Sequence, residues 1–270
     1  DKEAYPCFYI YRQTDGDHVY TGVIGGAATE DYENNVIKKH EATLTKRERL
    51  FRDYLDITGF NAEPVLLTYP DDPQMANFIE QRTSIRSEYE FHTTDGVLHE
   101  LWVIDKAPEI EGIMKAFSHY SSIYIADGHH RSASSALLAK EKNAPEYHQF
   151  LAYFIPESNL TILPFHRLFK GFKAMGTEQV LEQLEPHFTI EPTELPVDPG
   201  KRHHFGLCLF GDWFYLKLKE FQEPSSPVEG LDVQVATKRI IEPVFGITDQ
   251  RNDKRISFVG GEDQITAVND

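Results

Sequence analysis

An apolar run that stops at a crowded polar turn is the feature that most constrains how this chain folds. Residues 121–126 end at Asp127-Gly128-His129-His130-Arg131, and a helix-forming run over residues 132–142 follows directly. This order predicts a strand, a tight turn and a helix. Polar side chains crowded at the carboxyl end of a strand occupy the place where open α/β-type sheets bind ligands.

The residue types in this turn suit an anion. The amino end of a helix presents unused N–H groups and a partial positive charge. Gly128 lets a ligand approach the backbone closely, and Arg131 can donate two parallel hydrogen bonds to a phosphate or carboxylate. Asp127 repels anions, so we expect it to meet a hydroxyl or a metal ion. The structural alternative makes Asp127 an N-cap, with His129 and His130 facing solvent in the first helical turn.

Composition narrows the class of protein. The chain has 270 residues, 40% of them hydrophobic and 12% aromatic, which supports a packed core in one large or two small domains. Its net charge of −16 opposes binding to nucleic acids and anionic membranes, and no segment approaches the ~20 apolar residues of a membrane span. Cys7 and Cys208 lie in strand-like contexts and are expected to be free thiols. We therefore expect a cytoplasmic protein.

The order of elements predicts a mixed α+β fold. Turn signals flanked by apolar runs predict β-hairpins over residues 6–27 and 88–104, and residues 65–69 form a buried strand. Thr45 and Glu48 form a capping box for a helix that runs to about residue 57. We expect a core over residues 1–170 and a smaller α+β unit over residues 171–270. The first residue is Asp1 rather than Met, and we expect both ends to be truncated.

In the second half we expect a strand over residues 160–163, and a helix capped by Asp232 over residues 233–244. His166 and Arg167 follow the expected strand directly. Arg167 either closes a structural pair with a carboxylate or contacts a phosphate.

The adjacent pair His40-Glu41 lies in the loop before the helix that Thr45 caps. A His-Glu pair in a loop is more often exposed to solvent than part of a functional site. A second carboxylate near Asp127 would, however, suit proton abstraction or magnesium binding. Leu44 breaks a His-Glu-x-x-His pattern, so a zincin site is not supported.

Other familiar sites are missing from the sequence. The twelve histidines do not fall at helical metal-ligand spacing and no cysteine accompanies them, so we expect no structural metal site. The chain contains neither a P-loop nor a Gly-x-Gly-x-x-Gly fingerprint.

Three motifs in order resemble those of a bacterial and archaeal family catalogued as domain-of-unknown-function family 1015. They are residues 37–43 (IKKHEAT), residues 127–131 (DGHHR) and residues 163–167 (LPFHR). The resemblance covers essentially the whole chain. Family members are usually longer at both ends, which agrees with the expected truncation. The family name itself carries no activity.

The Asp-Gly-His-His-Arg turn is also similar, more distantly, to that of free-serine kinases of the ParB/sulfiredoxin-like class. This resemblance implies a mixed sheet core of that type, with nucleotide phosphates at the amino end of the helix. On this basis catalysis falls to Glu41, Asp127 and His130. The nucleotide contacts fall to Gly128, His129 and Arg131. His166 and Arg167 are added to them as candidate phosphate contacts on the chemistry of their own side chains, not on this resemblance. Lys238 and Arg239 match a further phosphate contact weakly. Sulfiredoxin activity is not implied, because His129 stands where its cysteine is needed.

Three functions fit this pattern. The first is a phosphotransferase that uses ATP or ADP with Mg²⁺ and acts on a small hydroxyl-bearing metabolite. The second is a non-catalytic nucleotide-binding switch module, and the third is a phosphohydrolase with water as the nucleophile. A second carboxylate close to Asp127 in space would favour an enzyme over a binding module.

Overall fold

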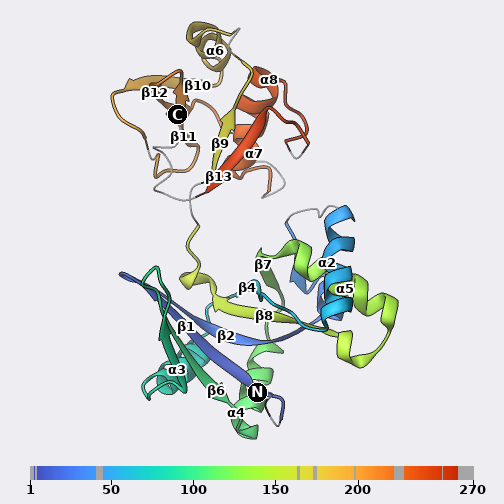
Figure 1. The fold of residues 1–270 in the computed structure, drawn as a ribbon. Coiled ribbons are helices and arrows are strands. Elements are labelled where there is room, and N and C mark those ends of the chain that lie inside the picture. The colour runs from blue at the N-terminus through green and yellow to red at the C-terminus, as the bar shows by residue number, and fades with distance from the viewer. Residues whose placement is uncertain are drawn as a thin grey trace. The chain divides into compact units, whose positions relative to one another are not determined.

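The structure is a computed structural model that describes residues 3, 5–40, 45–162, 165–172, 175–197, 199–221, 228–250 and 252–260. The chain divides into two compact units, Asp1–Thr161 and Ile162–Asp270 (Figure 1). Each unit has its own hydrophobic core and is described by itself. No helix among the described residues is both long and apolar enough to cross a membrane.

The first unit is built on an eight-stranded sheet with the order β3-β7-β4-β8-β2-β1-β6-β5. The strands are β1 (Phe8–Asp15), β2 (His18–Ala28), β3 (Ile37–Lys38), β4 (Val65–Tyr69), β5 (Tyr89–His92), β6 (Leu98–Ile104), β7 (Ile123–Asp127) and β8 (Gln149–Pro156). The pairs β3–β7 and β4–β8 are parallel and the other neighbours are antiparallel. The predicted α+β class, with a mixed sheet and two hairpins, is therefore confirmed.

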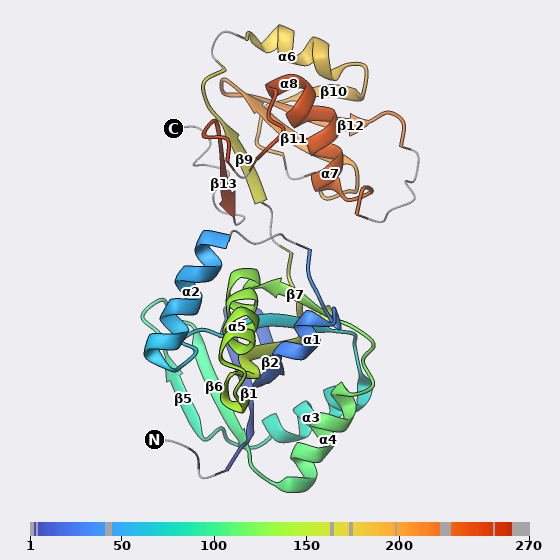
Figure 2. The same ribbon diagram turned by 90° about the vertical axis from the view of Figure 1, so that its right-hand side faces the viewer.

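Five α-helices are described in this unit. They are α1 (Thr29–Glu33), α2 (Thr45–Thr58), α3 (Pro73–Thr83), α4 (Ala107–Phe117) and α5 (His129–Lys142), with short 3₁₀ turns η1 (Pro145–Tyr147) and η2 (Glu157–Asn159). Ile10 and Trp102 are cross-strand partners on one face of the sheet. In the core they join Ile79 of α3 and Ile113 of α4. These two helices therefore cover the part of the sheet around β1 and β6 (Figure 2).

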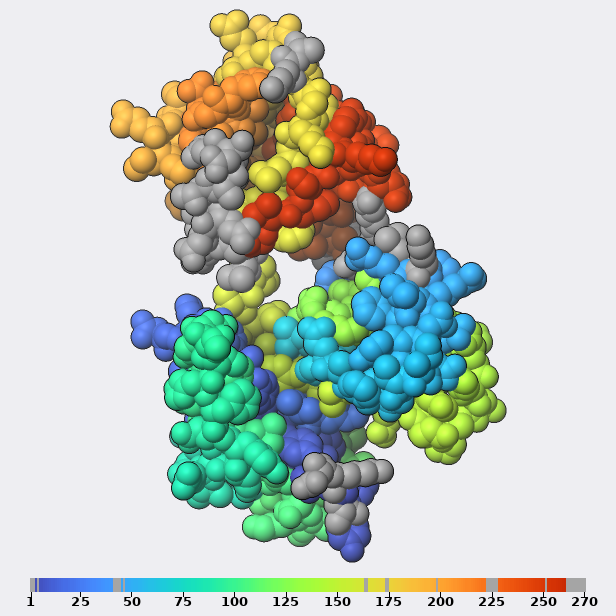
Figure 3. Space-filling model, viewed as in Figure 1, coloured from blue at the N-terminus to red at the C-terminus, as the bar shows by residue number. Residues whose placement is uncertain are grey.

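Small side chains let α5 pack closely. Its buried face consists largely of alanine and serine, and the serine hydroxyls bond to carbonyls of the preceding turn: Ser132, Ser134 and Ser135. Helices α2 and α5 lie side by side on the surface of the unit (Figure 3). The ion pairs Arg52–Glu141, at 3.2 Å, and Lys142–Asp56, at 2.6 Å, join them. The helix that follows the His40 loop is therefore held against the helix that follows the polar turn.

The second unit is a smaller α+β assembly, as predicted. One sheet pairs β9 (Phe165–Phe169) with β13 (Ile256–Gly260), and a second has the order β10 (Phe188–Thr193), β12 (Asp212–Leu218), β11 (His204–Leu209). The helical segments are α6 (Thr177–Leu184), α7 (Asp232–Ala236), a π-helical turn η3 (Thr237–Ile241) and α8 (Glu242–Phe245).

Two predictions in this unit are wrong. Residues 160–162 form no strand, residue 163 lies outside the described residues, and His166 and Arg167 lie inside β9 rather than after a strand. Asp232 does not cap its helix, because its carboxylate accepts the His203 backbone N–H at 2.9 Å. The single helix expected there changes pitch at η3, just ahead of Pro243, which lacks the N–H of a continuous α-helix.

Candidate functional site

The predicted strand, turn and helix are present, as β7, Gly128 and α5. Gly128 is left-handed, with φ 99° and ψ 27°. A Cβ atom at this position would lie 3.1 Å from Arg131 Nε and 3.2 Å from Val65 Cγ1. Only glycine fits both the backbone conformation and the space. The helix begins at His129, so both histidines belong to its first turn.

The interpretation of Asp127 as an N-cap is wrong. Gly128 holds the N-cap position, and no side chain caps α5. The Asp127 carboxylate accepts a hydrogen bond from Arg131 Nη2 instead. The first-turn N–H groups of α5 are thus left without a capping carboxylate, which is the arrangement that an anion-binding helix end requires.

Arg131 is the centre of the cluster. Its guanidinium bonds to Asp127 and to the carbonyl of Pro64, and Nη1 lies 3.2 Å from Glu63 Oε2. The Arg131 side chain is 20% exposed, whereas those of Glu63 and Asp127 are 72% and 73% exposed. Two open carboxylates therefore share one largely buried cation. This arrangement holds the guanidinium in place while both acids stay accessible to a ligand.

Glu63 was missed by the sequence reasoning. No motif marks it, and it lies 64 positions before Asp127 in the chain. The antiparallel pairing of β4 with β7 brings the start of β4 to the end of β7, with Leu66 opposite Asp127. A strand-pairing prediction for residues 65–69 is the one signal that could have found this second carboxylate.

The His40 loop also reaches the turn. The ring centroids of His40 and His129 are 4.3 Å apart, and the two rings meet edge to face at 82°. Strands β3 and β7 are parallel neighbours, so their carboxyl ends meet at the same edge of the sheet. This explains why His40, two residues past the end of β3, lies beside His129, the residue just after Gly128. Glu41, the predicted base, lies outside the described residues.

His130 is half-buried in the first turn of α5. Its Nδ1 atom is buried and has no hydrogen-bond partner among the described residues. A buried ring nitrogen without a partner is uncommon, because buried polar atoms are nearly always hydrogen-bonded. This nitrogen is therefore available to a ligand or a water molecule.

His166 and Arg167 belong to the second unit. As neighbours in a strand they point to opposite faces of the β9–β13 sheet, so they cannot act as a side-by-side pair. Arg167 Nη1 donates to the Phe165 carbonyl at 3.0 Å, and the guanidinium lies over the Phe258 ring at 5.8 Å. Its Nε atom is buried without a partner in the part of the chain that the structure describes.

No carboxylate among the described residues pairs with Arg167, so they do not supply the structural ion pair considered from the sequence. Burial lowers the pKa of its guanidinium, which means that the surroundings disfavour the charge. Lys238 and Arg239 lie in η3 and are exposed, and Lys238 Nζ is bound to Glu242 at 2.7 Å.

The described residues contain no cluster of three or more His, Cys, Asp or Glu side chains that could hold a metal ion. Magnesium, however, is often bound by one or two carboxylates together with substrate phosphates and waters. Asp127 and Glu63 fit that pattern, because both are exposed and both lie on the same guanidinium.

Fold and site together define an α+β protein with a compact polar cluster at a strand–turn–helix junction. The chain belongs to the family described as Protein of unknown function (DUF1015), whose model matches residues 1–234. That description assigns no activity. No curated protein and no solved structure matches the chain.

Proposed function

We propose that this protein is a nucleotide-dependent phosphotransferase that acts on the hydroxyl group of a small metabolite. The observation that carries the proposal is the sharing of Arg131 by Asp127 and Glu63 at the uncapped amino end of α5. The reaction class comes from the similarity of residues 127–131 to the corresponding turn of free-serine kinases of the ParB/sulfiredoxin-like class.

In this proposal the nucleotide phosphates lie at the amino end of α5. The left-handed Gly128 turns the chain into α5, and the first-turn N–H groups of α5 point out of the amino end of the helix. His129 and Arg131 contribute further donors. The phosphate contacts predicted for His166 and Arg167 rest on the sequence alone, and both residues lie in the second unit.

The charges of the cluster explain why a cation is needed. Asp127 and Glu63 carry two negative charges and Arg131 one positive charge, so the cluster is net negative and by itself repels phosphate. Magnesium held by Asp127 and Glu63 would neutralise phosphate charge. Arg131 would then be free to exchange a carboxylate for a phosphate oxygen.

A proton must also leave the substrate hydroxyl. Asp127 and Glu41 are the proposed acceptors, and His130 can exchange a proton or a hydrogen bond through its unpartnered Nδ1. The second carboxylate, Glu63, favours an enzyme over a non-catalytic switch, because, with Glu63 at the magnesium ion, Asp127 can serve as the proton acceptor.

The test is a turnover assay on the full chain with ATP or ADP, Mg²⁺ and a panel of hydroxyl metabolites that begins with serine. The readouts are nucleotide conversion and the mass of the phosphorylated product. We expect nucleotide conversion that depends on the metabolite, and a loss of about 10²–10³-fold in Arg131→Ala, the usual effect of removing a charge-stabilising group.

The matched control is Arg82→Ala. Arg82 is a half-buried arginine in the same unit that donates to the Val103 carbonyl, and it should leave turnover intact. Release of inorganic phosphate without a phosphorylated product would instead assign a phosphohydrolase. Saturable nucleotide binding without turnover would assign the switch module.

A further inference from the structure

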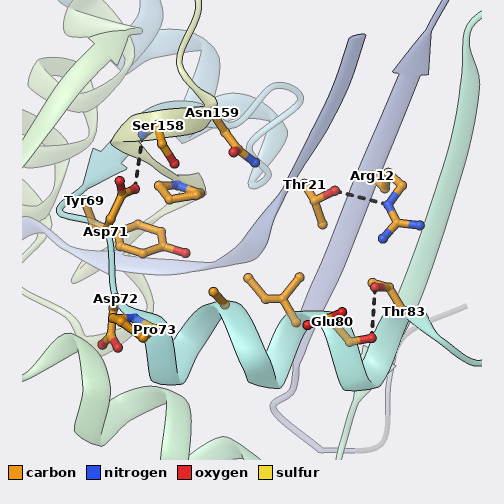
Figure 4. A pocket seen from close by; sticks show the side chains of 13 residues that line it. Arg12, Thr21, Tyr69, Asp71, Asp72, Pro73, Glu80, Thr83, Ser158 and Asn159 are labelled. Atoms are coloured by element: carbon orange, nitrogen blue, oxygen red, sulfur yellow. Dashed lines mark hydrogen bonds between the residues drawn. The ribbon is translucent and has the colours of Figure 1, made fainter. Parts of the chain in front are cut away.

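A cavity of about 490 Å³ lies in the first unit, away from the polar turn (Figure 4). Strands β1, β2 and β4, helix α3 and turn η2 line it. Strand β4 starts at Val65, beside Gly128, and ends at Tyr69, which lines the cavity. The cavity and the polar turn therefore lie at opposite ends of one strand, and the proposed phosphotransfer does not use the cavity.

Tyr69 places a polar atom in this cavity. Its side chain is 1% exposed and its ring stacks on Tyr120, with centroids 5.3 Å apart. The hydroxyl points into the cavity and forms no hydrogen bond with any residue drawn there (Figure 4). Burial raises the pKa of this phenol well above its ordinary value of 10.0, so the group stays neutral. A buried tyrosine hydroxyl usually has a hydrogen-bond partner, and here the cavity must supply it.

The sheet side of the cavity carries a positioned cation. Arg12 Nε donates to Thr21 Oγ1 at 3.1 Å, and the guanidinium lies over the Trp102 ring at 5.2 Å. Its ion-pair partner is the cross-strand neighbour Glu100, whose Oε2 lies 3.8 Å from Arg12 Nη1, too far for a hydrogen bond. The guanidinium is thus fixed in direction but keeps donors for a ligand.

Acidic groups lie elsewhere on the wall. Asp71 follows β4, and one of its oxygens accepts the Ser158 backbone N–H at 3.1 Å, which leaves the other oxygen open. Glu80 projects from α3, and no described residue forms an ion pair with its carboxylate. Strands β1 and β4 are three places apart in the sheet, or about 14 Å at the usual strand spacing. Arg12 and Asp71 are therefore not placed to neutralise each other directly.

We propose that this cavity binds a small zwitterionic metabolite of dipeptide size, which carries an ammonium at one end and a carboxylate at the other. The carboxylate meets Arg12 and Thr21, the ammonium meets Asp71 at the opposite end of the cavity, and the Tyr69 hydroxyl bonds between them (Figure 4). A carboxylate without an ammonium leaves Asp71 unmatched, and a diamine brings a cation to Arg12. The volume lies within the ~300–1,000 Å³ range of small-molecule sites.

The experiment is titration calorimetry on the full chain without nucleotide. The panel holds the standard amino acids, a set of dipeptides, propionate as a carboxylate and putrescine as a diamine. We expect one dipeptide to bind with a stoichiometry of one, and Arg12→Gln and Asp71→Asn each to weaken binding at least about tenfold, as for a lost charged hydrogen bond. Tyr69→Phe, which keeps the ring packing, should weaken it by about fivefold.

Glu111→Gln, an exposed acid on α4, is the matched control and should bind as the wild type does. Circular dichroism shows whether each variant is folded. Three results would overturn the proposal: no binding by any zwitterion at millimolar concentration, equal binding of putrescine, or equal binding in all three cavity variants. The last result would place the ligand elsewhere, for example at the polar turn. Because no nucleotide is present, failure here leaves the proposed phosphotransfer untouched.

Discussion

The imidazole of His40 meets that of His129 edge to face, with ring centroids 4.3 Å apart. This contact joins a loop that follows β3 to the first turn of α5, across 89 positions of sequence. It exists because β3 pairs in parallel with β7 and places both strand ends at one edge of the sheet. The upstream and central sequence motifs therefore meet in one place.

Removal of the His40 ring should change the magnetic environment of His129. In His40→Ala we expect clear shifts of the His129 ring resonances, because an aromatic ring at this distance contributes a ring current. His18→Ala, which removes a ring from the β1–β2 hairpin, should leave them unchanged. The check is a two-dimensional NMR spectrum of histidine-labelled protein. Unchanged His129 resonances in His40→Ala would rule out the contact.

Gly128→Ala should destabilise the first unit. The left-handed backbone alone costs an L-residue about 1 kcal/mol, and the close approach of Arg131 and Val65 adds to this, so we expect a loss of about 2–3 kcal/mol. Two glycines serve as controls in chemical denaturation. Gly59→Ala, with φ +71° but open space, should lose less. Gly112→Ala, in an exposed helix interior, should gain about 0.5–1 kcal/mol. Equal losses of unfolding free energy in Gly128→Ala and Gly59→Ala would show that Arg131 and Val65 do not crowd a side chain at Gly128.

The parts of the fold and of the polar cluster that could be predicted are those set by residues close together in the sequence. The junction at residues 123–142 was predictable because an apolar strand, a glycine and a helical run follow one another directly. To predict the contact of His40 with the turn, only the parallel pairing of β3 with β7 would have to be known in addition. The partnership of Glu63 with Arg131 was not predictable, because it depends on the register of β4 against β7 and no residue type marks it.

The wrong N-cap assignments of Asp127 and Asp232 arose because other groups in the fold compete for their carboxylates. Aspartate is a good N-cap in isolation, yet Asp127 is drawn to the guanidinium one helical turn away and Asp232 to the backbone of His203. Propensity gives the same expectation for both residues, and tertiary contacts decide otherwise. Similarly, the adjacent positions of His166 and Arg167 in the sequence suggest that their side chains act together. Both residues lie in strand β9, however, so their side chains point to opposite faces of the sheet.

Asp72 should contribute stability that depends on pH. The Tyr120 hydroxyl donates to its carboxylate at 2.8 Å, and the Gln74 amide of α3 does so at 2.8 Å, and together they hold the pKa of Asp72 below its ordinary range. Asp72→Ala should therefore cost about 1–2 kcal/mol at pH 7 through the lost N-cap and hydrogen bond.

Because the pKa of Asp72 is lower in the folded state, this stability is fully present above the unfolded pKa of about 3.9 and is lost as the pH falls through the folded value. Urea denaturation from pH 7 to pH 3 should show the difference between wild type and Asp72→Ala shrinking below about pH 4. Glu111→Ala provides an exposed control. A difference that grows towards low pH would contradict the assignment.

Arg167 should not stabilise the second unit in the absence of an anion. It is a desolvated cation with no acidic partner among the described residues, so Arg167→Met should leave stability unchanged or raise it by up to about 2 kcal/mol. Inorganic phosphate should raise the denaturation midpoint of the wild type and of Lys170→Met, an exposed control, but not that of Arg167→Met. A loss above about 1 kcal/mol in Arg167→Met would show that the arginine is structural.

The most direct test of the central claim is calorimetry of nucleotide binding at the turn. The titration uses ATP, ADP, CTP and pyrophosphate, with and without Mg²⁺, on wild type, Arg131→Ala and Arg82→Ala. We predict saturable, Mg²⁺-dependent binding of one nucleotide by wild type and Arg82→Ala. At a nucleotide concentration one hundred times the dissociation constant, the bound nucleotide should stabilise the fold by roughly 2.7 kcal/mol and raise the melting temperature accordingly. Arg131→Ala should bind at least about tenfold more weakly, as for a lost charged hydrogen bond. Equal binding by Arg131→Ala, or no binding by the wild type, would contradict a phosphate site at the amino end of α5.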